Sequence, residues 1–141
     1  MAYVTSRNFH LPETKAKMSA SFWFNLWTKR FWPYRAISPG DVLYWYESRS
    51  QCVLWRSHIR TVVAFEYANK RDAANRLIAD FGEFPQDQSY FQSGPEAGYC
   101  LAWNVEPIAR VNLPRPVGFR FNQLGWMKLA DVVDQWPELA V

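Results

Sequence analysis

The chain has 141 residues, 49% of them apolar and 21% charged, which are ordinary proportions for a globular protein. No apolar run approaches the length of a membrane-spanning helix, and no apolar stretch follows a basic start, so we expect neither a spanning segment nor a secretory signal. We therefore expect one domain over residues 1–141, located in the cytoplasm, with Cys52 and Cys100 as reduced thiols in the core.

Two compositional features stand out from this background. Aromatic residues make up 18% of the chain and include eight tryptophans, more than a small core normally uses, so we expect a few of them to line a pocket. The first 60 residues hold nine Lys and Arg against three Asp and Glu, while the remainder has a net negative charge. A basic half suits a polyanionic partner, although a solvated surface with uneven charge explains it equally well.

The first 40 residues predict short elements joined by polar and basic segments. Residues 2–9 predict a strand, which a polar connector follows. Residues 22–27 (FWFNLW) come after a possible helix cap at Ser19–Ser21 and predict a short helix, with a strand as the alternative because aromatic residues disfavour neither. Residues 28–39 form a basic loop interrupted by proline.

A β-hairpin is predicted over residues 41–65, after a Pro-Gly turn and with residues 48–51 at its tip. Its second arm alternates between two faces. One face carries Val53, Trp55, Ser57, Ile59 and Thr61, and the other carries Leu54, Arg56, His58 and Arg60. A row of cations on a rigid sheet beside aromatic strands is typical of nucleic-acid binding and poorly suited to catalysis.

One clear helix is predicted in the second half of the chain. Residues 69–81 place apolar side chains at helical spacing, with Asn69 as the N-cap and Gly82 as the stop. A polar loop is expected over residues 83–97.

The last third predicts strands, turns and a closing helix. Residues 98–105 predict a strand that continues, bent, over 108–113, with Pro107 at an edge or a bulge. A polar loop then ends in a Gly-Trp pair, and residues 129–136 predict a helix ended by a proline. Together these elements predict an α+β fold, in which five or six strands form a curved or closed sheet and two or three helices pack around it.

The sequence lacks the residue patterns of the common catalytic and metal sites. There are only two histidines, and His58 lies between two arginines, whose charges make it a poor acid or metal ligand. No HxH, HExxH, DxD or Cys/His cluster provides metal ligands, and no glycine-rich loop would hold a phosphate. We therefore expect no catalytic residues, no metal and no cofactor.

Three clusters of residues predict a binding site. In FWFNLW the amide of Asn25 lies beside Trp23, and a buried amide costs free energy unless it is hydrogen-bonded, so a pocket that reads the edge of a base would explain it. The hairpin supplies Trp55, and the late loop supplies Gln123 and Trp126. For each aromatic ring the alternative is a place in the core.

The order of these segments resembles the EVE family of the PUA-like superfamily, whose relatives include the YTH and ASCH domains. The resemblance covers roughly residues 3–129. It rests on the aromatic motif, on SPGDVLYWYES with its Gly-Asp turn, on GYCLAWNVEPIARVNLP and on QLGWMKL. In that family a small polar residue ends the strand after the turn, a place that Ser48 takes here. The chain departs from the family in that Arg7-Asn8 lies earlier than the usual Arg-Asn pair, and the usual early tryptophan is not found cleanly.

The resemblance implies a partly open β-barrel with packed helices, whose aromatic pocket receives a modified, methylated base flipped out of RNA or DNA. It implies six base-contacting residues: Trp23, Asn25, Ser48, Trp55, Gln123 and Trp126. Basic residues would hold the nucleic-acid backbone, namely Lys29, Arg30, Arg35, Arg49, Arg56 and Arg60. A separate effector protein is a further candidate partner, because EVE-like domains are often modules of modification-dependent restriction systems.

Two other functions stay open on the sequence alone. A small ASCH-like ribonuclease or amidohydrolase would need a base or a nucleophile near the pocket, and Glu47 and Tyr46 are the nearest candidates. A protein that binds a small ligand or a partner protein would share the aromatic pocket, and its affinity would not depend on salt.

Overall fold

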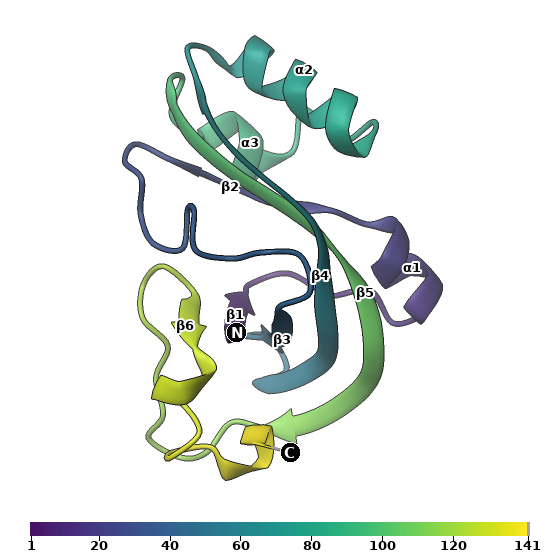
Figure 1. Ribbon diagram of the computed structural model, residues 1–141, viewed down its shortest axis with the longest axis vertical. Coiled ribbons are helices and arrows are strands. Elements are labelled where there is room, and N and C mark those ends of the chain that lie inside the picture. The colour runs from purple at the N-terminus through teal and green to yellow at the C-terminus, as the bar shows by residue number, and fades with distance from the viewer. Residues whose placement is uncertain (141) are drawn as a thin grey trace.

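Six strands form one strongly curled sheet in the computed structural model, which describes residues 1–140 (Figure 1). Across the sheet the order is β2 (Trp23–Trp27), β5 (Gly98–Pro114), β4 (Cys52–Tyr67), β3 (Val42–Glu47), β1 (Ala2–Arg7) and β6 (Trp126–Lys128). Neighbouring strands are antiparallel except for β1 and β3, which are parallel. Because β2 and β6 are not paired with each other, the sheet is a half-barrel.

Three helices accompany the sheet: α1 (Lys15–Ala20), α2 (Lys70–Phe81) and α3 (Ser89–Ser93). Two short 3-10 helices, Leu129–Asp131 and Pro137–Ala140, follow β6. The predicted α+β fold, with five or six strands in a partly open barrel and two or three packed helices, is therefore confirmed.

The long antiparallel pair of β4 and β5 runs the length of the molecule and bows across it (Figure 1). The predicted hairpin is confirmed, with its turn at residues 48–51 between β3 and β4. Pro107 lies opposite Ser57, next to a shift in register between β4 and β5. The pairing of β2 with β5 ends at Trp103, so the β2 side of β5 is unpaired at Pro107. A proline is tolerated at such a position because it has no N–H to donate to a neighbouring strand.

For residues 22–27 the predicted helix is wrong and the strand alternative is confirmed, because Trp23–Trp27 forms β2. β2 pairs with β5 in full register from Trp23↔Trp103 to Trp27↔Tyr99, and four of its five residues are buried. An apolar segment that is buried on both faces lacks the one-sided pattern of a surface helix, and pairing with a central strand decides its structure.

The predictions of the smaller helices also differ from the structure. The expected polar connector holds α1, which Thr14 caps by accepting a hydrogen bond from the Lys17 N–H. The expected loop over residues 83–97 holds α3. The expected helix over 129–136 is a 3-10 turn followed by irregular turns, and Pro137 begins a second 3-10 helix instead of ending the first. A proline is well tolerated in a first helical turn, where its missing N–H is not needed.

The helix over Lys70–Phe81 is confirmed with its predicted caps. The Asn69 side chain accepts a hydrogen bond from the Asp72 N–H at 2.9 Å, and Gly82 ends the helix with a positive φ. Ala73, Ala74 and Leu77 are buried against one end of the β4–β5 pair.

Aromatic rings dominate the interior. Trp45, Trp55, Trp103 and Trp126 are fully buried within the curl of the sheet, and Trp136 closes a separate cluster beneath the C-terminal turns. Cys52 and Cys100 are unpaired, and burial raises the pKa of the Cys100 thiol. Within residues 1–140 no helix is long and apolar enough to cross a bilayer.

Candidate functional site

A cavity of about 430 Å³ opens between the end of β1, the start of β2, α3 and the loop before β6. This volume lies in the range of pockets that bind small organic ligands. Thirteen residues line it: Ser6, Arg7, Asn8, Phe9, Phe22, Trp23, Phe24, Gln88, Tyr90, Asn122, Gln123, Leu124 and Gly125. The four segments that contribute them are far apart in sequence, so the fold creates this site.

Arg7 is the one charged side chain in this lining. It is only 9% exposed, and none of the ion pairs formed within residues 1–140 involves it. Its guanidinium carbon lies 5.1 Å from the ring centroid of Trp103 and 5.5 Å from that of Trp126. Burial lowers the pKa of Arg7 to about 10, so the group is charged at neutral pH but poorly solvated.

Directed hydrogen bonds fix the position of Arg7. Its Nε and Nη2 both donate to the Thr5 hydroxyl, at 3.1 and 2.6 Å, and that hydroxyl donates to the Gly125 carbonyl at 3.0 Å. The Ser6 N–H donates to the same carbonyl at 2.7 Å. The strand that carries Arg7 is thereby joined to the loop on the opposite wall.

Gly125 permits this close approach between β1 and the late loop. A Cβ atom at this position would lie 2.9 Å from the Ser6 carbonyl oxygen, and the residue has a φ of +73°. Asn122 holds the other end of the loop, because its side-chain oxygen accepts the Gly125 N–H at 2.9 Å. Of the Gly-Trp pair singled out in the sequence, Gly125 thus lines the cavity, while Trp126 is buried outside the lining.

Asn25 lies beneath the cavity as part of a buried network. Its Oδ1 accepts a hydrogen bond from the Trp126 indole N–H at 3.0 Å and a long one from Arg7 at 3.5 Å. An indole nitrogen only donates, so it fixes the orientation of the amide and directs the Asn25 Nδ2 to the Tyr90 hydroxyl at 3.3 Å. The amide is therefore satisfied by the protein itself.

Aromatic side chains form the walls and the rim. Trp23 lines the cavity and packs on Trp45 at a ring-centroid distance of 4.4 Å. Phe9 and Tyr90 at the rim are about two-fifths exposed, at 41% and 42%. Exposed rings beside a hollow provide flat surfaces on which a planar ligand can stack.

The six predicted base-contacting residues fall into three groups. Trp23 and Gln123 line the cavity, and Asn25 and Trp126 lie beneath it. Ser48 and Trp55 lie outside the lining.

The last two have identifiable structural contacts. Ser48 is exposed, and its backbone N–H donates to the Arg7 carbonyl at 2.9 Å. Trp55 is buried in the core, where its indole N–H donates to the Pro12 carbonyl at 2.8 Å.

The six predicted backbone-binding cations are distributed over several elements. Lys29, Arg30 and Arg35 lie in the loop between β2 and β3, and Arg30 and Arg35 stack over Tyr99 and Tyr34. Arg56 and Arg60 lie on β4, where Arg60 contacts Glu106 at 3.6 Å. Arg49, in the hairpin turn, is the one of the six that contacts a residue of the cavity lining, because its Nε donates to the Asn8 carbonyl at 3.4 Å.

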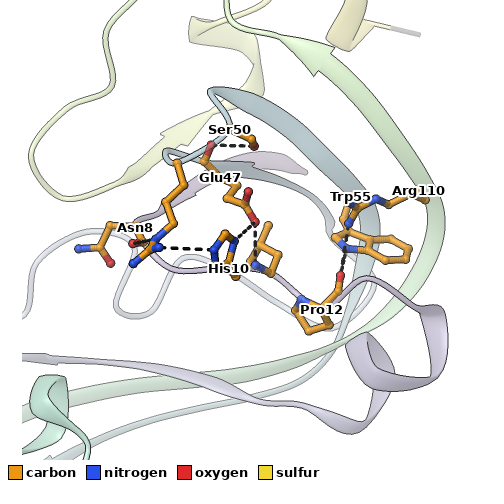
Figure 2. A network of polar contacts seen from close by, with 9 residues as sticks. Asn8, His10, Pro12, Glu47, Ser50, Trp55 and Arg110 are labelled. Atoms are coloured by element: carbon orange, nitrogen blue, oxygen red, sulfur yellow. Dashed lines mark hydrogen bonds and ion pairs between the residues drawn. The ribbon is translucent and has the colours of Figure 1, made fainter.

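Neither residue named for the enzymatic alternative lines the cavity. Glu47 is buried and accepts the Leu11 N–H at 2.8 Å, while its second contact is His10 at 3.9 Å (Figure 2). Tyr46 packs against Phe121 and Trp136 in the C-terminal cluster. Within residues 1–140 no group of three or more His, Cys, Asp or Glu side chains could hold a metal ion.

Four residues line the cavity but are not among the site residues that the sequence predicts: Arg7, Asn8, Phe9 and Tyr90. Within the EVE resemblance, Arg7 and Asn8 only mark a departure from the family pattern. The one signal in the sequence is that Arg7 follows Tyr3 and Thr5 at the spacing of one strand face, and this face is buried, so an unpaired charge on it is costly. Tyr90 lies in α3, a five-residue helix within a segment whose sequence predicts only a polar loop.

Comparisons with known proteins support the fold. No protein-family model and no curated protein matches the chain. The crystal structure of ASCH from Zymomonas mobilis is similar, with a TM-score of 0.58 at 15% identity, over 98% of this chain and 94% of that one. Two variants of the Zymomonas protein, a tyrosine-to-phenylalanine mutant and a serine-to-alanine mutant, each give a TM-score of 0.55 at 16% identity. Each match covers 94% of this chain. It covers 96% of the tyrosine-to-phenylalanine mutant and 94% of the serine-to-alanine mutant.

The fold is accordingly the PUA-like one, as the sequence predicted. The structural neighbours are ASCH proteins, so the resemblance to the EVE family itself is not shown. An identity of 15–16% carries the comparison no further than the fold.

Proposed function

We propose that this protein is a nucleic-acid-binding module that receives a single flipped base in the cavity beside Arg7. The observation that carries the proposal is the combination of aromatic walls with one buried cation in a cavity of about 430 Å³. A flipped base needs a flat surface for stacking and fixed polar groups at its edge. Phe9, Trp23 and Tyr90 offer the stacking surface, and Arg7 offers the polar group.

The charge around the cavity supports a polyanion as the partner. Arg49 lies at the rim through its hydrogen bond to Asn8, and the loop between β2 and β3 adds Lys29, Arg30 and Arg35. Cations that touch phosphates set the affinity and its salt dependence without conferring sequence preference. Reading of a methylated base, or cooperation with a separate effector, is a narrower version of the same proposal.

Fluorescence anisotropy of labelled single- and double-stranded RNA and DNA oligonucleotides, titrated at 50 and 200 mM salt, tests this function. The informative variant is Phe9→Ala, because Phe9 is an exposed ring at the rim and its removal leaves the core intact. Loss of one stacking partner should weaken binding by about 1–3 kcal/mol, equivalent to roughly 5- to 150-fold. Affinity should also fall steeply with salt.

Val117→Ala is the control. Val117 is a fully exposed apolar side chain that lies outside the cavity lining and outside the basic loop between β2 and β3. Its removal should leave the affinity within about twofold of wild type, since exposed substitutions away from a site have small effects. Equal losses in the two variants, or no binding to any oligonucleotide, would contradict the proposed function.

A further inference from the structure

Two hydrogen-bond donors at the cavity have no acceptor in the protein. Arg7 uses Nε and Nη2 on Thr5 and Asn25, while its Nη1 has no partner within residues 1–140. The fully buried side-chain nitrogens and oxygens without a partner in residues 1–140 do not include Nη1, so this atom keeps some contact with solvent. A nearly buried guanidinium that lines the cavity thus keeps two N–H bonds without a partner in the described chain.

The Tyr90 hydroxyl is the second unused donor. It accepts hydrogen bonds from the Leu26 N–H at 2.9 Å and from the Asn25 side chain at 3.3 Å. These two bonds occupy both lone pairs of the oxygen, so its own proton is left to donate, and no protein acceptor takes it within the described residues. The side chain that supplies this proton lines the cavity.

The charge of the cavity is also uncompensated. The lining contains no Asp and no Glu, and its one charged group is Arg7. A guanidinium removed from water, without a carboxylate beside it, gains most from a ligand that carries the missing negative charge. A neutral ligand would leave the charge buried and unpaired.

We infer that the cavity selects a planar ring that carries an anionic oxygen group, specifically a base with a carboxylate substituent. The ring would stack on the aromatic walls, while the carboxylate accepts the Arg7 Nη1 and Tyr90 hydroxyl donors. This inference rests on the proposed function and names the ligand class of the same site. A methylated base offers the aromatic walls an extra apolar group and gives the two donors only neutral acceptors at its edge, so the charge of Arg7 stays unpaired.

The test compares one oligonucleotide bearing 5-carboxycytosine, 5-methylcytosine or unmodified cytosine at the same position, together with free 5-carboxycytidine and cytidine nucleosides. Binding is measured by isothermal titration calorimetry on the full chain. Charge-assisted hydrogen bonds are the strong ones, so we expect the carboxylated oligonucleotide to bind at least about tenfold more tightly than the methylated one.

Three variants locate the effect. Arg7→Met removes the positive charge and the hydrogen-bond donors, so it should abolish the preference for the carboxylate. Arg7→Lys should keep part of this preference, because lysine retains the charge but lacks the planar guanidinium. Arg76→Met is the matched control, since Arg76 also stacks on a ring, that of Phe65, but lies on α2 outside the cavity. The variant Arg76→Met should keep the full preference.

Each outcome tests either the inferred ligand class or the proposed binding of nucleic acid. Equal affinity for carboxylated and methylated oligonucleotides, or a preference that survives in Arg7→Met, overturns the inference and leaves the proposed function standing. Arg7-dependent binding of the free carboxylated nucleoside, without binding of any oligonucleotide, supports the inference about the ligand but overturns the nucleic-acid function. If no probe binds at all, the inference is wrong.

Discussion

A single residue, Arg7, contributes to the proposed ligand binding at the expense of stability. Its folded-state pKa of about 10 lies below the ordinary value of 12.5, because burial disfavours the charged form. Between these two values the unfolded chain holds a proton that the folded chain has lost, so stability rises with pH there. At neutral pH, below both values, the unfavourable contribution of the buried charge is fully present.

Replacement of Arg7 by methionine should therefore not weaken the fold. We expect the free energy of unfolding of Arg7→Met at pH 7 to be equal to wild type or higher, by up to about 3 kcal/mol, because an apolar side chain needs no counter-charge. Urea denaturation followed by circular dichroism measures this. A loss of more than about 1 kcal/mol would mean that the bonds from Arg7 to Thr5 serve the fold and not a ligand.

The residue types in the sequence predicted an aromatic pocket, but they identified only some of the residues that line it. Trp23 and Gln123 were identified because an aromatic cluster and a Gly-Trp loop are local patterns. The burial of Trp126 and the satisfaction of Asn25 depend on a hydrogen bond between residues 101 positions apart, which no local pattern encodes. Arg7 was missed for the same reason, because its unpaired state is visible only once the fold shows that no carboxylate lies nearby.

At the scale of elements, the segment between β1 and α1 is held in place by the β3–β4 hairpin (Figure 2). Glu47 accepts the Leu11 N–H at 2.8 Å, and Arg49 donates to the Asn8 carbonyl. Farther along, the Pro12 carbonyl accepts hydrogen bonds from Trp55 at 2.8 Å and from Arg110 at 3.3 Å. Since Asn8 and Phe9 form part of the rim, this connection positions the mouth of the cavity.

Substitution of Glu47 separates this positioning role from the catalytic role considered for the enzymatic alternative. Glu47→Ala leaves the Leu11 N–H unsatisfied and should cost about 1–3 kcal/mol of unfolding free energy, while Glu47→Gln keeps an acceptor and should cost less. Thermal denaturation gives the order of the two variants. A general base would show the opposite pattern, in which Glu47→Gln abolishes a turnover on RNA or amide substrates that the wild type performs, without loss of stability.

Local patterns predicted the long elements and failed for the short ones. The hairpin and α2 were predicted correctly because turn residues, alternation and caps agree with one another over more than ten residues. β2 has five residues and α3 has five, and neither is long enough for its own periodicity to decide. For β2 the deciding interaction is its pairing with β5, some 75 residues away in the sequence.

For the whole molecule, the cavity lies between two regions of the fold, each of which supplies part of its lining. Phe22, Phe24 and Tyr90 come from the side that α2 and α3 cover, where Phe24 packs in their cluster. Arg7 and Gly125 come from the β1–β6 side. A ligand that contacts Arg7 and Tyr90 together therefore bridges both regions and should restrain segments that are distant in sequence.

Hydrogen–deuterium exchange with and without the carboxylated oligonucleotide tests this bridging. We expect slower amide exchange in peptides that cover residues 88–93 and 122–125, because local opening of either wall must break contacts with the ligand. The exposed face of α2 should be unchanged, and the effect should vanish in Arg7→Met. Protection confined to residues 28–39 would instead place the nucleic acid on the basic loop alone, which would mean that no base enters the cavity.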